Sequence, residues 1–163
     1  MSFTPELLQQ ATELLAAARA KGLKIATAES CTGGLIAGLL TEIAGSSDVF
    51  ERGFVTYSNQ AKEEMLGVPA ALLRQHGAVS EAVARAMAEG AIRNSTSDLS
   101  VAVTGIAGPG GGTDEKPVGL VHIAAARAGT ATATRLCRFG DIGRGQVRLK
   151  TVEAALTLVE TLL

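Results

Sequence analysis

Two candidate nucleophiles, Ser30 and Cys31, stand side by side in the segment TAESCTGG. The segment follows a short apolar stretch and leads into an apolar helical pattern. We therefore expect it at a strand-to-helix junction, where open α/β sheets bind their ligands. Gly33 and Gly34 lack a Cβ and would let a substrate oxygen approach the backbone, facing the free N–H groups of the helix's first turn. The segment predicts an oxyanion or phosphate site beside a nucleophile.

A simpler interpretation of this segment fits the pattern equally well. Ser30 or Thr32 would be the N-cap of the helix, a position where hydroxyl side chains are common, and the two glycines would only pack. Both interpretations stay open at this point.

A lysine that could act as a base occurs at position 62, in the segment TYSNQAK. Ser58 or Asn59 can serve as an N-cap, which places Lys62 in or just after the first turn of a helix. A cation there opposes the helix dipole at a cost of about 0.3–1 kcal/mol, and burial would favour the neutral amine further. A lysine that acts as a general base must be destabilised as a cation in this way. The alternative is a solvated surface charge, since Glu63 and Glu64 adjoin it.

A glycine-rich loop is expected at 105–117, directly after a strand. It matches neither the dinucleotide pattern nor the P-loop pattern. Thr104 at the strand end, together with the amides from Gly105 onward, could hold an anion or a carbonyl group. A long surface loop is the alternative, although loops of this length in compact domains are often functional.

The chain contains only two histidines, His76 and His122. His76 is expected at a helix end and His122 in the middle of a strand, so neither is a good catalytic base. If a nucleophile operates, Lys62 is the better partner, in a Ser-Lys arrangement. Two histidines and two cysteines are too few for a convincing metal cluster, and we expect no metal and no cofactor.

Alternating helices and strands must position these groups. We expect helices at about 5–21, 35–43, 59–66, from 69 onward, 80–92 and 145–162, and strands at 23–28, 49–57, 99–103, 118–126 and 132–139. This alternation predicts an α/β layered fold. No helix separates the last two strands, so they should pair antiparallel in a mixed sheet. The connector at 94–97 is too short for a linker, and residues 1–163 are expected to form a single domain.

The composition of the 163-residue chain excludes several classes of protein. Hydrophobic residues make up 47%, which argues against disorder, and the formal net charge is −1 with 3% aromatic residues. A nucleic-acid binder normally has a basic patch or an aromatic stacking platform. The N-terminus lacks the layout of a secretory signal, and no apolar run reaches membrane-spanning length. We expect a cytoplasmic protein.

Four segments in this order, TAESCTGG, AGSSDVFERGFVTYSNQAK, HGAVS and GIAGPGGGTDEKPVG, resemble the C-terminal domain of the competence-damage-inducible (CinA) protein family. The resemblance covers about Leu7 to Leu156. Larger family members carry an additional N-terminal domain of molybdopterin-binding type, for which this chain has no room. The chain is therefore most similar to the stand-alone amidases of the family.

The resemblance implies an activity and an architecture. The activity is hydrolysis of the carboxamide of nicotinamide mononucleotide to nicotinate mononucleotide and ammonia, a step of pyridine nucleotide salvage. The architecture is a three-layer α/β/α sandwich with a five-stranded mixed sheet, no metal, and assembly as a homodimer or higher homo-oligomer.

The resemblance also implies roles for individual residues. Ser30 would be the nucleophile and Lys62 its base, while Tyr57 and Thr104 would position the substrate or a catalytic water. Arg148 would contact the phosphate or another part of the substrate. The oxyanion would be bound by the turn amides of Cys31, Thr32, Gly33 and Gly34. The phosphate could be bound either by the amides at Ser46 and Ser47 or by those of the loop that contains Gly105 and Gly108.

Three alternatives stay open. Cys31 could be the nucleophile of a cysteine amidase. The chain could be a non-enzymatic module that serves DNA uptake or the damage response. It could also be a homologue that binds pyridine nucleotides without turnover.

Overall fold

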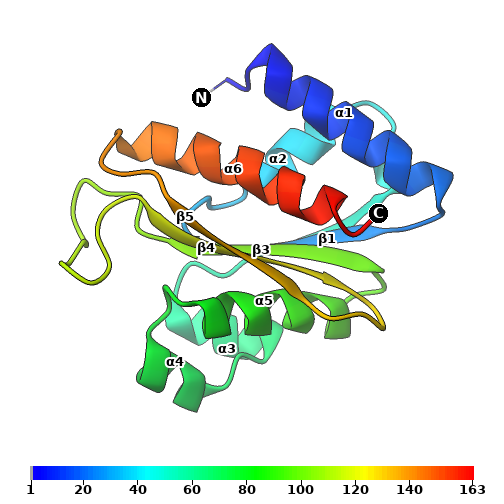
Figure 1. Cartoon of the computed structure of the whole chain (residues 1–163). Coiled ribbons are helices and arrows are strands. Elements are labelled where there is room, and N and C mark those ends of the chain that lie inside the picture. The colour runs from blue at the N-terminus through cyan, green and yellow to red at the C-terminus, as the bar shows by residue number, and fades with distance from the viewer. Residues whose placement is uncertain (1) are drawn as a thin grey trace.

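A five-stranded mixed sheet lies between two layers of helices in the computed structural model, which describes residues 2–163 (Figure 1). The strand order is β2-β1-β3-β4-β5. β1 pairs in parallel with β2 and β3, while β4 pairs antiparallel with β3 and β5. The strands are β1 (Ile25–Glu29), β2 (Phe50–Val55), β3 (Leu99–Gly105), β4 (Leu120–Arg127) and β5 (Ala133–Arg138). The predicted α/β sandwich with a mixed sheet is confirmed.

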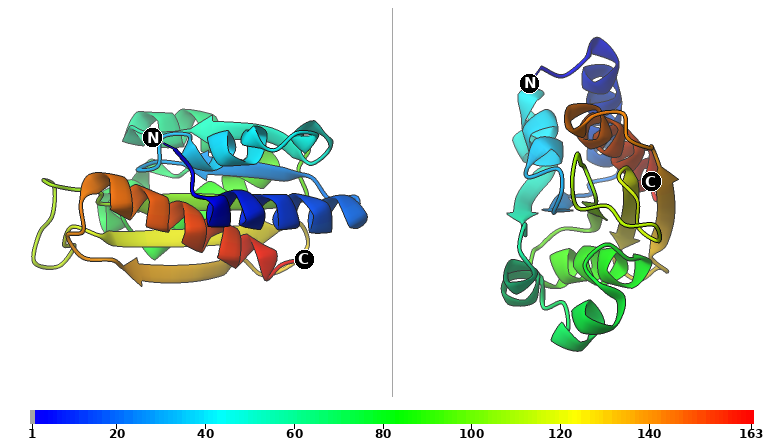
Figure 2. Two further views of the ribbon diagram at one scale, coloured as in Figure 1. Left: turned by 90° about the horizontal axis from the view of Figure 1, so that it is seen from above. Right: turned by 90° about the vertical axis from the view of Figure 1, so that its left-hand side faces the viewer.

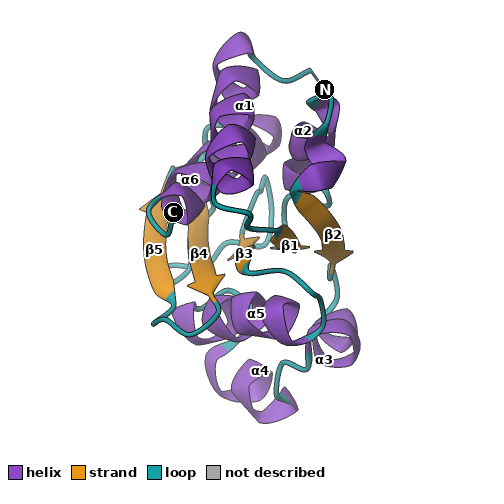
Figure 3. Cartoon of the chain, turned by 90° about the vertical axis from the view of Figure 1, so that its right-hand side faces the viewer, coloured by secondary structure: helices purple, strands orange, loops and turns teal. Residues whose placement is uncertain are grey.

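Helices cover both faces of the sheet. α1, α2 and α6 lie on one face and α3, α4 and α5 on the other (Figure 3). The helices are α1 (Pro5–Ala20), α2 (Leu35–Glu42), α3 (Asn59–Leu66), α4 (Ala70–His76), α5 (Glu81–Arg93) and α6 (Arg144–Glu160), with a 3₁₀ turn η1 at Ser46–Asp48 before β2. Each predicted helix is present, with ends shifted by at most two residues.

Local capping signals explain where two of these helices begin. The Thr4 side chain accepts a hydrogen bond from the Leu7 N–H, and Pro5 occupies the first position of α1. The Ser58 side chain accepts one from the Ala61 N–H at the start of α3. α3 therefore begins at Asn59, which fixes the position of Lys62 along the helix.

The interior strand β1, which lies between β2 and β3, is buried along its whole length, because helices cover both of its faces. Successive side chains of a strand point to opposite faces of the sheet. Ile25 packs in the core cluster formed with α1, α2 and α6, whereas Ala26 and Ala28 pack in the cluster formed with α3, α4 and α5. Glu29 therefore falls on the same face as Ile25, toward α2.

The C-terminal ends of the three parallel strands meet at one edge of the sheet. Glu29 of β1 is in register with Val55 of β2 and Val103 of β3. The turn before α2, the segment before α3 and the glycine-rich loop all leave the sheet at this edge. The right-hand view of Figure 2 looks onto this end of the molecule, with the loop facing the viewer. The fold thus gathers the predicted chemical groups at one edge.

A glycine allows α3 to approach α5 closely. A Cβ at Gly90 of α5 would lie 2.1 Å from the carbonyl oxygen of Leu66, the last residue of α3. Leu66 follows Lys62 by one helical turn, so the Gly90 contact sets how deeply the lysine-bearing helix sits.

We expect Gly90→Ala to lower the free energy of unfolding by about 1–3 kcal/mol, because α3 must move away to admit the methyl group. Urea denaturation measures this change. Gly110→Ala is the matched control, since a Cβ there meets no atom within 4 Å, and its effect should stay within about 0.5 kcal/mol. Equal losses in the two variants would contradict the close packing of α3 on α5.

Candidate active site

Ser30 is the first residue after β1, and its backbone is fixed on both sides. Its N–H donates to the carbonyl of Val103 at 3.1 Å, and its own carbonyl accepts from the Gly33 N–H at 3.0 Å. Gly33 and Gly34 then adopt positive φ angles of 58° and 104°. The two glycines are needed because this backbone conformation is strained for other residues.

The first turn of α2 does not face a ligand, which corrects the sequence prediction. The buried carboxylate of Glu29 accepts hydrogen bonds from the N–H groups of Ile36 at 2.8 Å and Ala37 at 3.0 Å. It also accepts one from the Thr32 hydroxyl at 2.6 Å. The acid of the TAESCTGG segment therefore occupies the position where an anionic ligand was expected.

The alternative prediction of a hydroxyl N-cap is wrong as well. The N-cap of α2 is Gly34, which makes no side-chain capping hydrogen bond. The Thr32 hydroxyl is bonded to Glu29 and the Gly33 N–H to Ser30, so neither group is available to a substrate. Thr32, Gly33 and Gly34 shape the turn that carries Ser30 and lie outside the lining of the adjoining cavity.

Lys62 is buried, and its amine contacts Ser30. The Lys62 side chain is 1% exposed, and Nζ lies 3.0 Å from Ser30 Oγ. The same Nζ donates to the backbone carbonyls of Thr56 at 2.8 Å and Tyr57 at 3.5 Å. Burial lowers the pKa of the Lys62 amine, and the neighbouring Cys31 thiol opposes this shift. The surface-charge alternative for Lys62 is therefore wrong.

Ser30 and Lys62 open onto a cavity of about 280 Å³ whose lining comes from five separate parts of the chain. The lining residues are Ser30, Cys31, Tyr57, Asn59, Lys62, Ala78, Val79, Thr104, Gly105, Ile106, Ala107, Gly108, Gly110, Gly111 and Arg144. Most of the predicted site residues are thus brought together. Neither histidine of the described chain belongs to this lining.

The glycine-rich loop forms one side of the cavity and is fixed at several points. Thr104 at its start is buried, and its hydroxyl donates to the carbonyl of Ala78 at 2.9 Å. Lys116 near its end donates to the carbonyl of His76 at 2.6 Å. Because Thr104 and Ala78 both line the cavity, the bond between them joins two parts of its wall.

Arg144, which the sequence reasoning missed, is the only residue in the lining besides Lys62 that can carry positive charge, and the lining contains no acid. It is the first residue of α6. Its Nη1 donates to the carbonyl of Gly108 at 2.8 Å and its Nη2 to the Tyr57 hydroxyl at 3.0 Å. The only sequence signal was its position directly after Gly143, at the start of a helix.

Arg148, the predicted substrate contact, donates to the turn that carries Ser30. Its Nε donates to the carbonyl of Cys31 at 3.1 Å, and its Nη2 donates to that of Thr32 at 3.0 Å. Arg148 does not line the cavity, whereas Arg144, one helical turn earlier, does. The predicted contact of Arg148 with a substrate stays a prediction.

Ser46 and Ser47 lie too far away to bind a substrate phosphate in this cavity. They belong to η1, which precedes β2, and β2 runs parallel to β1 with Phe50 opposite Ile25. The parallel pairing puts η1 at the edge of the sheet opposite Ser30. Of the two predicted phosphate loops, only the one with Gly105 and Gly108 reaches the cavity.

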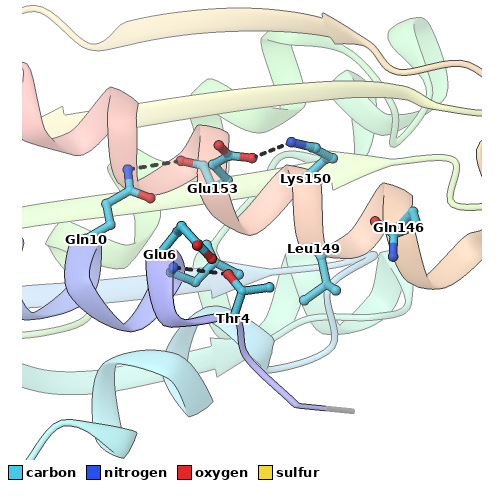
Figure 4. Close-up of a pocket in the computed structure, with 8 residues that line it drawn as sticks. Thr4, Glu6, Gln10, Gln146, Leu149, Lys150 and Glu153 are labelled. Atoms are coloured by element: carbon cyan, nitrogen blue, oxygen red, sulfur yellow. Dashed lines mark hydrogen bonds and ion pairs between the residues drawn. The ribbon is translucent and has the colours of Figure 1, made fainter.

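A second cavity, of about 310 Å³, lies between α1 and α6 (Figure 4). Its polar side chains are largely bonded within the protein: Lys150 pairs with Glu153 at 2.9 Å, and Gln10 donates to the Glu153 carbonyl at 3.4 Å. The lining is formed by Thr4, Glu6, Leu7, Gln10, Gln146, Leu149, Lys150 and Glu153, and contains none of the predicted site residues.

Residues 2–163 contain neither a cluster of metal-binding side chains nor a membrane-spanning helix. No group of three or more His, Cys, Asp or Glu side chains is placed to hold a metal ion. No helix in this part of the chain has the length and apolar character needed to cross a membrane.

Comparisons with known proteins agree on one relationship. A family model described as the CinA C-terminal domain matches residues 8–163. Nicotinamide-nucleotide amidohydrolase PncC of Escherichia coli K12 is 51% identical over 152 residues, which cover 93% of this chain and 91% of that protein. The crystal structure of the competence/damage inducible protein CihA from Agrobacterium tumefaciens has a TM-score of 0.96 and 52% identity, and the match covers 99% of both chains.

Some curated relatives are much longer than this chain. A CinA-like protein of Anaeromyxobacter dehalogenans is 55% identical over 141 residues, which cover 86% of this chain and 34% of that protein. The chain therefore spans about a third of the length of such relatives.

The lowered pKa of Lys62 predicts a pH-dependent contribution to stability. The unfolded chain, in which lysine has its ordinary pKa, binds more protons than the folded chain as pH falls from about 10 to the folded pKa, so stability rises with pH in this window. We expect the unfolding free energy of the wild type to increase relative to Lys62→Met between about pH 7 and pH 10. Chemical denaturation at several pH values measures the difference. A constant difference would mean that the buried amine keeps its ordinary pKa.

Proposed function

The chain belongs to the CinA C-terminal domain family, and we propose that it is an amidohydrolase that converts nicotinamide mononucleotide to nicotinate mononucleotide and ammonia. The observation that carries this proposal is the 3.0 Å contact between Ser30 Oγ and the buried Lys62 Nζ at the edge of a cavity. The name of the E. coli relative supports the choice of substrate. Homo-oligomerisation and a cytoplasmic location stay predictions from the sequence.

The electrostatics of the cavity favour an anionic substrate. Arg144 places a permanent positive charge in the lining, while no Asp or Glu belongs to it. A guanidinium has five N–H donors, and the protein uses two of those of Arg144. The remaining three can bind a phosphate. We propose that Arg144, together with the amides of the Gly105–Gly111 loop, holds the phosphate of the mononucleotide.

The contacts of Lys62 suit a neutral amine that acts as a base. A neutral amine has two N–H groups and one lone pair. The carbonyls of Thr56 and Tyr57 accept the two N–H groups, which leaves the lone pair for the Ser30 hydroxyl. Burial lowers the pKa of this amine, so that the neutral form is reached at a lower pH than for an exposed lysine.

The proposed reaction proceeds through an acyl-enzyme. Lys62 accepts the proton of Ser30 while Oγ attacks the carboxamide carbon, and the amide of Cys31, next to the nucleophile, binds the developing oxyanion. Protonated Lys62 then donates its proton to the departing nitrogen as the C–N bond breaks and ammonia leaves. A water molecule, deprotonated by Lys62, then attacks the ester carbon; as the C–O bond to Ser30 breaks, Lys62 returns the proton to Oγ and nicotinate mononucleotide is released.

Cys31 is a poor candidate for the nucleophile, although it lines the same cavity. Burial raises the pKa of its thiol to about 11, and the neighbouring Glu29 contributes to the shift. A cysteine attacks as the thiolate, and the thiol therefore stays protonated at neutral pH. The pKa of Cys31 supports Ser30 as the nucleophile.

We expect Ser30→Ala and Lys62→Ala each to lower kcat/KM for nicotinamide mononucleotide by at least about a thousandfold, because each removes one half of the proton-transfer pair. Ammonia release measures the activity, and urea denaturation establishes that each variant is folded. Cys31→Ala is the matched control and should retain most of the activity. An active Ser30→Ala protein together with an inactive Cys31→Ala protein would establish the cysteine alternative.

The phosphate contact predicts a selective effect of Arg144→Gln. KM for nicotinamide mononucleotide should rise by about tenfold or more, because a charge-assisted contact to the phosphate is lost. We expect kcat/KM for nicotinamide riboside, which lacks the phosphate, to change little in the same variant. Arg135→Gln removes an exposed arginine outside the cavity and is the control. Equal losses on both substrates would contradict a phosphate role for Arg144.

A further inference from the structure

We infer that Glu29 is a positioning residue that holds the Ser30 nucleophile within reach of Lys62; this inference rests on the proposed function. Glu29 is 0% exposed and does not belong to the cavity lining. It therefore cannot touch a substrate and must act through its neighbours.

The carboxylate of Glu29 joins the nucleophile turn to α2. Oε1 accepts from the Thr32 hydroxyl at 2.6 Å and from the Ile36 N–H at 2.8 Å, while Oε2 accepts from the Ala37 N–H at 3.0 Å. Thr32 lies two residues after Ser30 in the same turn. Movement of the carboxylate would release both the turn and the start of the helix.

The backbone of Glu29 reaches the lysine side of the site. Its carbonyl accepts from the Thr56 N–H at 2.9 Å, and the Thr56 carbonyl in turn accepts from Lys62 Nζ at 2.8 Å. Glu29 thus contacts the segments that carry nucleophile and base. This double connection distinguishes it from an ordinary helix cap.

The N-terminus of α2 has no acid or side-chain cap of its own, and Glu29 supplies the negative charge from β1. The N-cap of α2 is Gly34, which provides no side-chain cap, and the first turn contains no acidic residue. Negative charge is favourable at the N-terminus of a helix, and an ionised carboxylate has two accepting oxygens. A glutamine has one oxygen and an NH₂ group, so an N–H would face an N–H in either orientation of its amide. Glu29→Gln should therefore displace the turn while preserving side-chain size.

The test compares Glu29→Gln, Thr32→Val and Thr32→Ser with the wild type. We expect kcat of Glu29→Gln and Thr32→Val to fall by at least about tenfold, because small displacements of reacting groups are costly, with KM within about threefold of the wild type. Thr32→Ser keeps the hydroxyl and should retain kcat within about twofold. In a crystal structure of Glu29→Gln, Ser30 Oγ should lie beyond hydrogen-bond distance of Lys62 Nζ.

Each result decides for or against the inference. An unchanged separation of Ser30 and Lys62 in the variant crystal structure overturns it, and so does an unchanged kcat. Equal losses in Thr32→Ser and Thr32→Val also overturn it, because the hydroxyl would then be irrelevant. If the wild type releases no ammonia from nicotinamide mononucleotide, the proposed function fails, and the Ser30–Lys62 separation in the variant still decides the role of Glu29. If Glu29→Gln does not fold, the two Thr32 variants decide it.

Discussion

The contact between Ser30 and a buried amine at position 62 is the constraint on which the rest of the structure depends. An amine removed from water must find acceptors, and here the acceptors are backbone carbonyls in the segment before α3. The amine must also be shielded from water. α3, which carries Lys62, packs closely against α5 at Gly90, and the Lys62 side chain is buried. The depth of α3 therefore sets the burial that lowers the pKa of the Lys62 amine.

Much of the fold could be predicted because its signals are local. The helix Asn59–Leu66 agrees with the prediction at both ends, since Ser58 caps it at the start and Gly67 adopts a left-handed conformation at the end. Strand ends were less predictable. The strand expected at 49–57 ends at Val55, and the carbonyls of the next two residues accept hydrogen bonds from Lys62 Nζ. Apolar character does not distinguish a residue inside a strand from one that directly follows it.

The candidate site was predictable where its groups follow strands and unpredictable where they meet across the chain. Ser30, Thr104 and the glycine loop were found because the ends of parallel strands converge at one edge. The roles of Arg144 and Arg148 depend on contacts to residues 87 and 117 positions away, respectively, which no local pattern encodes. Glu29 is an acid in the TAESCTGG motif, but only the folded chain shows that its partners are the Thr32 hydroxyl and the amides of α2.

The two arginines of α6 have a consequence for biosynthesis. Arg144 and Arg148 are one turn apart on one helix. The first contacts the loop and Tyr57, and the second donates to the carbonyls of the two residues that follow Ser30. α6 follows all the other elements in the chain, so a ribosome produces it after them. A nascent chain that already contains Ser30 and Lys62, but has not reached α6, lacks the guanidinium groups of both arginines. The cavity is completed only when this final helix docks, and a prematurely terminated translation product has no finished site.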